Sequence, residues 1–165
     1  MNIYQEESVK IVKSLFAIKI IPVLALETVA DGVKICELLS HYGLLSAEIT
    51  FRTKAAPEVI KEVSRQFPVL TVGAGTILNV GDLHKAFDAG AKFAVAPGFN
   101  PTVMKEAVKC GYAFSPGICT PSELEQAYVY CRRQGQGAGT LADIPQKEKR
   151  AYVIKQGDDF YAEGN

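Results

Sequence analysis

Five short apolar segments recur along most of the chain, and a segment with helical periodicity follows each of them. Equivalent positions in these segments are Pro22, Glu48, Gly73, Val95 and Phe114, which stand 26, 25, 22 and 19 residues apart. Strands that alternate with helices in this way run parallel and are joined by right-handed crossovers. The repeat therefore predicts an α/β fold, a parallel βα barrel of the TIM type that is incomplete, with about five βα units.

Residues that begin and end helices stand between the expected strands. Side chains of the N-cap type precede four of the helical segments, and glycines follow three of them. These residues are Thr28, Asn79, Asn100 and Thr120, then Gly43, Gly90 and Gly111. The expected helices accordingly begin and end between consecutive strands.

The apolar stretch at residues 14–26 has the length of a signal-peptide core. Lys19 and Pro22 interrupt it, however, and two acidic residues, Glu6 and Glu7, precede it. We therefore expect a buried first strand here. No stretch reaches the roughly 20 apolar residues that a membrane span needs, so we expect a cytoplasmic protein with no membrane partner.

The composition narrows the class of partner. The chain has 165 residues, of which 48% are hydrophobic, and this is enough for one domain with a core. Its 18 basic and 18 acidic residues give no net charge, so no nucleic-acid partner is expected. The four cysteines and two histidines lack the spacing of a zinc motif, and we expect no metal and no other cofactor.

The segment "SAEITFRT" at residues 46–53 is the most informative of the expected strands. Strand alternation sends its apolar residues to one face and Glu48, Thr50 and Arg52 to the other. In a βα barrel one face of each strand points at the helices and the other at the interior. We therefore expect these three side chains inside, near the carboxyl ends of the strands. A structural ion pair between Glu48 and Arg52 is the alternative.

Small residues end the next three strands, and they leave room for a ligand beside the charges. Each of them also suits an ordinary turn. They are Gly73, Gly75 and Thr76, then Pro97 and Gly98, then Ser115, Pro116 and Gly117. Taken together, they predict a pocket.

Four segments, "SAEITFRT", "TVGAGTI", "FAVAPGFNP" and "SPGICTPSEL", resemble in order and spacing the 2-dehydro-3-deoxy-6-phosphogluconate (KDPG) aldolases, which also act as 4-hydroxy-2-oxoglutarate (KHG) aldolases. The resemblance covers about residues 3–128. It implies a class I lyase that cleaves a phosphorylated 2-keto sugar acid to pyruvate and glyceraldehyde 3-phosphate. It also implies a homotrimeric barrel.

The resemblance also implies roles for four residues. Glu48 would be the general acid and base, which needs a carboxyl poised near working pH. Arg52 would bind the pyruvyl carboxylate with its planar guanidinium. Thr76 would hydrogen-bond the same end of the substrate, and Pro97 would line the pocket.

The chain changes character after Tyr128, where a run rich in glycine and glutamine precedes one strand-like piece, "AYVIK". We expect a partial barrel at residues 1–128 and a divergent tail at residues 129–165. The family pattern requires a sixth strand that carries the Schiff-base lysine, and no lysine stands at that position. Lys155 is the only later strand candidate, and its surroundings do not match the family's motif.

Three interpretations of the whole chain follow. It is an aldolase of this family, or a catalytically inactive remnant from a frameshift or a premature end, or a different barrel lyase or phosphate-binding synthase. In each case the first and fifth strands would be open edges, which favours self-association.

Overall fold

The computed structural model describes residues 3–133, with side chains described for residues 7–130. The strand-like piece "AYVIK" and Lys155 lie outside the described residues, as does most of the expected tail. Helices and strands alternate strictly in the order α1 (Ile3–Ile18), β1 (Val23–Leu24), α2 (Val29–His41), β2 (Ser46–Thr50), α3 (Ala56–Gln66), β3 (Thr71–Gly75), α4 (Val80–Asp88), β4 (Phe93–Ala96), α5 (Pro101–Cys110), β5 (Phe114–Pro116) and α6 (Pro121–Arg133).

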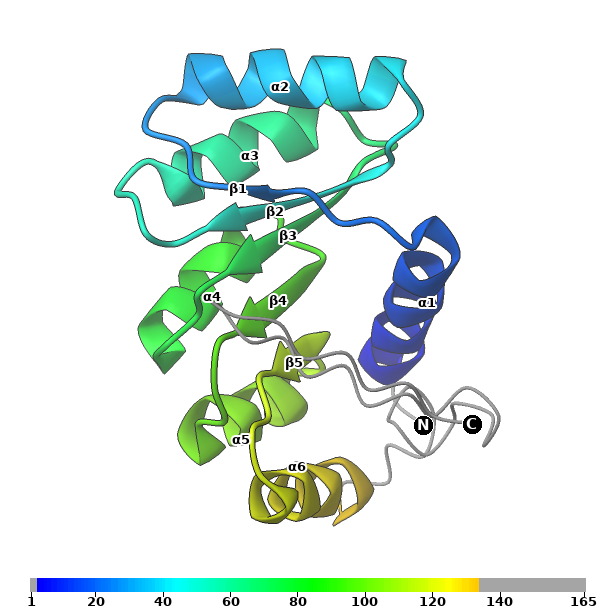
Figure 1. Cartoon of the computed structure of the whole chain (residues 1–165), viewed down its shortest axis with the longest axis vertical. Coiled ribbons are helices and arrows are strands. Elements are labelled where there is room, and N and C mark those ends of the chain that lie inside the picture. The colour runs from blue at the N-terminus through cyan, green and yellow to red at the C-terminus, as the bar shows by residue number, and fades with distance from the viewer. Residues whose placement is uncertain (1–2, 134–165) are drawn as a thin grey trace.

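The five strands form one parallel sheet in the order β1-β2-β3-β4-β5. Figure 1 shows helices α2 to α6 following one side of this curved sheet, while α1 stands apart from them. Strands β1 and β5 are the two edges of the sheet within the described residues. The predicted parallel, incomplete βα barrel is thereby confirmed.

The N-cap residues predicted from the sequence form their capping hydrogen bonds in the structure. At the start of α6, Thr120 Oγ1 accepts a hydrogen bond from the Glu123 amide at 3.2 Å, and the Glu123 carboxylate accepts one from the Thr120 amide at 2.9 Å. Gly111 ends α5 in the left-handed conformation, with φ 72°. The same capping role is filled at α2, α4 and α5 by Thr28, Asn79 and Asn100.

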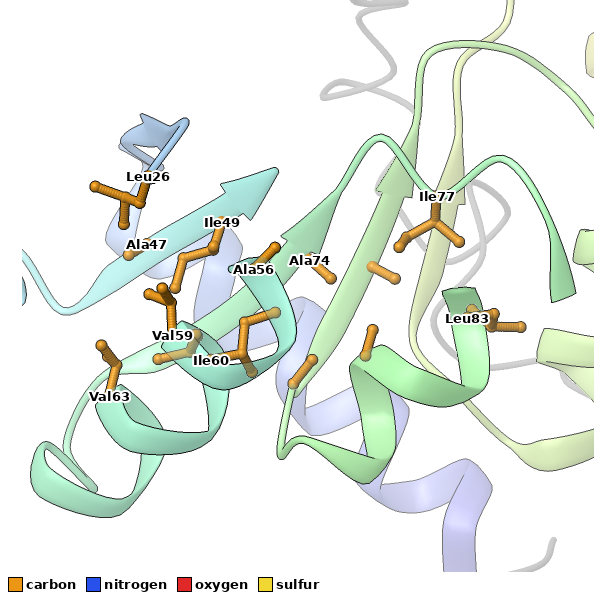
Figure 2. Packing of buried hydrophobic residues seen from close by; sticks show 14 of the residues in the cluster. Leu26, Ala47, Ile49, Ala56, Val59, Ile60, Val63, Ala74, Ile77 and Leu83 are labelled. Carbon is orange, nitrogen blue, oxygen red and sulfur yellow. The ribbon is translucent and has the colours of Figure 1, made fainter. Parts of the chain in front are cut away.

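The hydrophobic core lies between the sheet and the helices that cover it (Figure 2). Ala47 and Ile49 of β2 are fully buried there, against side chains such as Ile60 of α3. Because strand neighbours alternate, Glu48 and Thr50 must point to the opposite, inner face. The core thus fixes the direction of the polar side chains of β2.

A first strand does form within residues 14–26, as expected, but it is confined to β1 and is not buried. The first part of this segment continues α1, which ends where Lys19 adopts a left-handed φ of 67°. Only two residues then pair with β2, and Val23 is 57% exposed because β1 is the edge of the sheet. A short apolar run suits a helix and a strand equally, so its letters alone did not decide between them.

The helices of the described part are short or carry charged residues. Within residues 3–133, none combines the length and the apolar character needed to cross a bilayer.

Candidate functional site

The carboxyl group of Glu48 lies over the backbone of the neighbouring strand at Gly75. A Cβ atom on Gly75 would overlap Glu48 Oε1 and would stand 2.7 Å from the carboxyl carbon. In the sheet register Gly75 pairs with Thr50. The half-buried Glu48 side chain therefore leans forward, toward the carboxyl ends of the strands, and it can do so because residue 75 has no side chain.

Two opposing influences act on the acidity of Glu48. Burial raises the pKa of this carboxyl above its ordinary value, and the positive charge of Arg52 partly offsets that rise. A carboxyl group shifted toward neutral pH exchanges protons more readily at working pH. Burial thus moves the pKa of Glu48 in the direction that acid–base catalysis needs.

Arg52 stands two residues beyond the end of β2, not on the strand itself. Within the described residues no ion pair joins it to Glu48, so the expected alternative of a structural ion pair does not hold. Its exposed guanidinium has no hydrogen-bonded acceptor in the described part of the protein. The turn that carries it is anchored by Thr53, whose hydroxyl donates to the Leu26 carbonyl at 2.6 Å. Arg52 is thus held near Glu48 with its donors available to a ligand.

Thr76 directly follows β3 and adopts a left-handed φ of 62°. For a residue other than glycine this conformation costs about 1–3 kcal/mol. The next residue compensates, because Ile77 is fully buried and its amide donates to the Val95 carbonyl at 3.1 Å. Strain of this kind, held in place by packing, is common where a side chain must be aimed at a ligand.

Pro97 follows the last residue of β4, and its carbonyl group occupies the space that a side chain at residue 117 would need. A Cβ atom on Gly117 would overlap the Pro97 oxygen, and the Gly117 amide donates to the Ala96 carbonyl at 2.8 Å. The absence of a side chain at Gly117 therefore lets the ends of β4 and β5 approach closely. Pro97 itself is exposed at this end of the sheet.

We call the carboxyl ends of β2, β3 and β4, with Glu48, Arg52, Thr76 and Pro97, the Glu48 edge. The structure brings Glu48 and Arg52 within electrostatic reach of each other, and it places Thr76 and Pro97 at the ends of the next two strands. The roles of these four residues remain predictions.

Thr50 is a further polar residue of this face to which the sequence pattern gave a direction but no role. It is 1% exposed, and its hydroxyl has no hydrogen-bond partner within the described residues. A buried hydroxyl without a partner is unfavourable. In the sequence, the feature that could have pointed to Thr50 as a residue of this site is its position two residues after Glu48, on the same face of the strand.

The lysines of the described part are unsuited to Schiff-base chemistry. A lysine that forms a Schiff base must be desolvated enough to be a neutral amine. All ten lysine side chains within residues 7–130 are exposed: Lys10, Lys13, Lys19, Lys34, Lys54, Lys61, Lys85, Lys92, Lys105 and Lys109. None of these ten lysines is therefore buried enough to supply the amine.

Comparison with known proteins gives a family match and several relatives. A sequence model of the family described as KDPG and KHG aldolase matches residues 11–134. The 2-dehydro-3-deoxy-phosphogluconate aldolase of Treponema pallidum is 38% identical over 122 residues, which are 74% of this chain and 58% of that protein. The KHG/KDPG aldolase of Escherichia coli K12 is 34% identical over 105 residues, 64% of this chain and 49% of that protein. The chain thus spans about half the length of these relatives.

Solved structures of similar proteins superpose on the same part. The 2-keto-3-deoxy-6-phosphogluconate aldolase of Zymomonas mobilis ZM4, solved with 3-phosphoglycerate, is 37% identical with a TM-score of 0.63, over 67% of this chain and 52% of that one. The KDPG aldolase of Legionella pneumophila, solved with pyruvate captured as a covalent carbinolamine, is 27% identical with a TM-score of 0.65, over 72% and 61% of the two chains.

Proposed function

The chain belongs to the KDPG and KHG aldolase family, and we propose that it is a class I aldehyde-lyase. Its substrates would be 2-dehydro-3-deoxy-6-phosphogluconate, cleaved to pyruvate and glyceraldehyde 3-phosphate, and 4-hydroxy-2-oxoglutarate, cleaved to pyruvate and glyoxylate. The observation that carries this proposal is the Glu48 carboxyl, half-buried over Gly75 with a pKa raised by burial and with the Arg52 charge nearby.

Each residue of the Glu48 edge has a different role in this proposal. Arg52, whose donors have no acceptor in the described part of the protein, binds the carboxylate of the keto acid. Thr76 donates to the same end of the substrate, and Pro97 lines the pocket. Glu48 then moves protons, through water, as the carbinolamine forms, loses water and becomes an enamine. This arrangement fits a small anionic keto acid and requires no metal.

The carbon–carbon bond breaks only after an amine has formed an imine with the substrate ketone, because the iminium accepts the electron pair. The ten described lysines are exposed, so the amine would have to come from a lysine outside the described residues, where none stands at the position that the family pattern requires. That exposure also favours a second candidate function. In it the chain binds pyruvate at the Glu48 edge without covalent chemistry.

Borohydride reduction in the presence of pyruvate, followed by intact-mass measurement and peptide mapping, tests the proposal. A pyruvate adduct on a lysine outside the described residues, with pyruvate release from the sugar acid that Glu48→Gln abolishes, supports the lyase. An adduct on one of the ten described lysines would refute the site as drawn. The absence of any adduct, with pyruvate still bound, supports the second candidate.

The assembly and the location of the chain are also proposed from the family. We expect a homotrimer in the cytoplasm, with self-association promoted by the open edges at β1 and β5. Analytical ultracentrifugation over a range of protein concentrations measures the oligomer, and a monomer at high concentration would contradict it.

A further inference from the structure

Three side chains that carry metal-binding atoms converge between α4 and α5, on the helical side of the sheet. His84 comes from α4, and Glu106 and Cys110 come from α5. Their donor atoms all lie within 4.8 Å of one another. We propose that these three residues form a site for a divalent transition metal of the Zn²⁺ class, apart from the Glu48 edge.

Two of the three distances between the donor atoms fit a tetrahedral ion. His84 Nε2 stands 3.3 Å from Glu106 Oε1, and Cys110 Sγ stands 3.5 Å from the same oxygen. Zinc binds nitrogen and oxygen at about 2.0–2.2 Å and sulfur at about 2.3 Å, so the ligands around a tetrahedral ion stand roughly 3.3–3.8 Å apart. These two distances lie inside this range before any ion is bound, and the donor atoms of His84 and Cys110 lie within 4.8 Å of each other. Three protein ligands would leave a fourth position for water.

The barrel repeat explains why these residues meet although their sequence spacing shows no zinc motif. His84 lies on α4 and Glu106 on α5, the helices that follow the paired strands β3 and β4. Neighbouring helices of the repeat lie side by side, so the two side chains meet although 22 residues separate them. Cys110 follows Glu106 by four residues and so lies on the same face of α5.

Aromatic packing holds the imidazole of His84 in place. Its ring meets Tyr112 edge to face, with centroids 6.0 Å apart, and Tyr112 stacks on Phe87 at 3.8 Å with nearly parallel planes. An imidazole fixed by its neighbours loses less freedom when it binds an ion. The half-buried position of all three donors also shields the site partly from water.

In the metal-free chain Lys109 occupies part of the site. Its ammonium donates to both oxygens of Glu106 at 3.2 Å. Metal binding would displace the Lys109 ammonium from Glu106, and the Cys110 thiol would give its proton to solvent as the metal–sulfur bond forms.

Titration of the untagged 165-residue chain with Co²⁺ tests the site, because a thiolate bound to cobalt gives a charge-transfer band in the near ultraviolet. We expect this band to appear and to be removed by added Zn²⁺. Cys110→Ser should abolish it, and His84→Gln should weaken Co²⁺ binding about tenfold or more. The matched control is Cys119→Ser, which removes an exposed thiol elsewhere and should leave the band unchanged.

Lys109→Gln provides a test that cannot be confused with loss of folding. Removing the competing ammonium should strengthen Co²⁺ binding, whereas Lys105→Gln, one turn earlier on α5, should leave it unchanged. Circular dichroism checks that each variant is folded. Absence of the band in the folded parent chain, its survival in Cys110→Ser, or its loss in Cys119→Ser would overturn the proposal.

Discussion

The replacement Gly75→Ala should displace the Glu48 carboxyl group while leaving the free energy of unfolding almost unchanged. A Cβ atom at residue 75 would overlap Glu48 Oε1 and would stand 2.7 Å from Cδ and 3.0 Å from Cγ. All three atoms belong to the outer part of a flexible side chain, which can rotate away. An off-rotamer side chain costs about 0.5–1.5 kcal/mol. Replacing glycine with alanine also stabilises the folded state by about 0.4–1 kcal/mol, because it lowers the conformational entropy of the unfolded chain.

The free energy of unfolding of Gly75→Ala should therefore stay within about 1 kcal/mol of the parent chain. Gly73→Ala is the matched control, one pleat earlier on the same strand and face. Its Cβ would overlap three ring atoms of Phe93, which is 3% exposed and has no room to turn. Overpacking of this kind costs about 1–3 kcal/mol or more. Urea denaturation followed by circular dichroism measures both values.

The pKa of Glu48 provides the second measurement. Burial is what raises it, so in Gly75→Ala the displaced carboxyl should return toward its ordinary value, while Gly73→Ala should leave the shift in place. Carbon-detected NMR titration of the labelled carboxyl follows this directly. If Gly75→Ala cost as much stability as Gly73→Ala and left the pKa of Glu48 raised, the proposed position of the carboxyl would be wrong.

Three further replacements follow from the same face of the sheet. Thr50→Val removes a buried hydroxyl without a partner and should stabilise the chain by about 1–3 kcal/mol in urea denaturation; a loss of stability would show that the hydroxyl is satisfied. Arg52→Gln removes the charge that lowers the pKa of Glu48, so the same NMR titration should show that pKa rising further, and an unchanged value would place the guanidinium out of reach. Because the folded state raises the pKa of Glu48, ionisation of this carboxyl costs stability as the pH rises through its folded pKa. Glu48→Gln should therefore be more stable than the parent chain at neutral pH and no more stable below the unfolded pKa, and equal stabilities at both pH values would contradict the raised pKa.

Features set by local chemistry could be predicted from the sequence. The caps at Thr28, Asn79, Asn100 and Thr120 depend on side chains only a few residues from the amides they bind. The inward direction of Glu48 and Thr50 followed from strand alternation. The parallel order of the strands followed from the spacing of the repeat.

Features set by contacts between distant segments could not be predicted in this way. The end of β2 at Thr50 depends on the turn that Thr53 anchors to Leu26, a residue far back in the sequence. The place of the Glu48 carboxyl over Gly75 depends on a side-chain conformation that no spacing encodes. His84 and Glu106 come together only because successive barrel units lie side by side.

The most direct test of the central claim is an NMR titration of the ¹⁵N-labelled chain with pyruvate. The claim is that a keto acid binds at the Glu48 edge, with Arg52 holding its carboxylate. The amide signals of residues 48–53 and 73–77 should shift and saturate as pyruvate is added, and Arg52→Gln should abolish the saturation while Lys54→Gln, an exposed cation in the same turn, should preserve it. Shifts confined to other parts of the sheet, or saturation that survives Arg52→Gln unchanged, would contradict the claim.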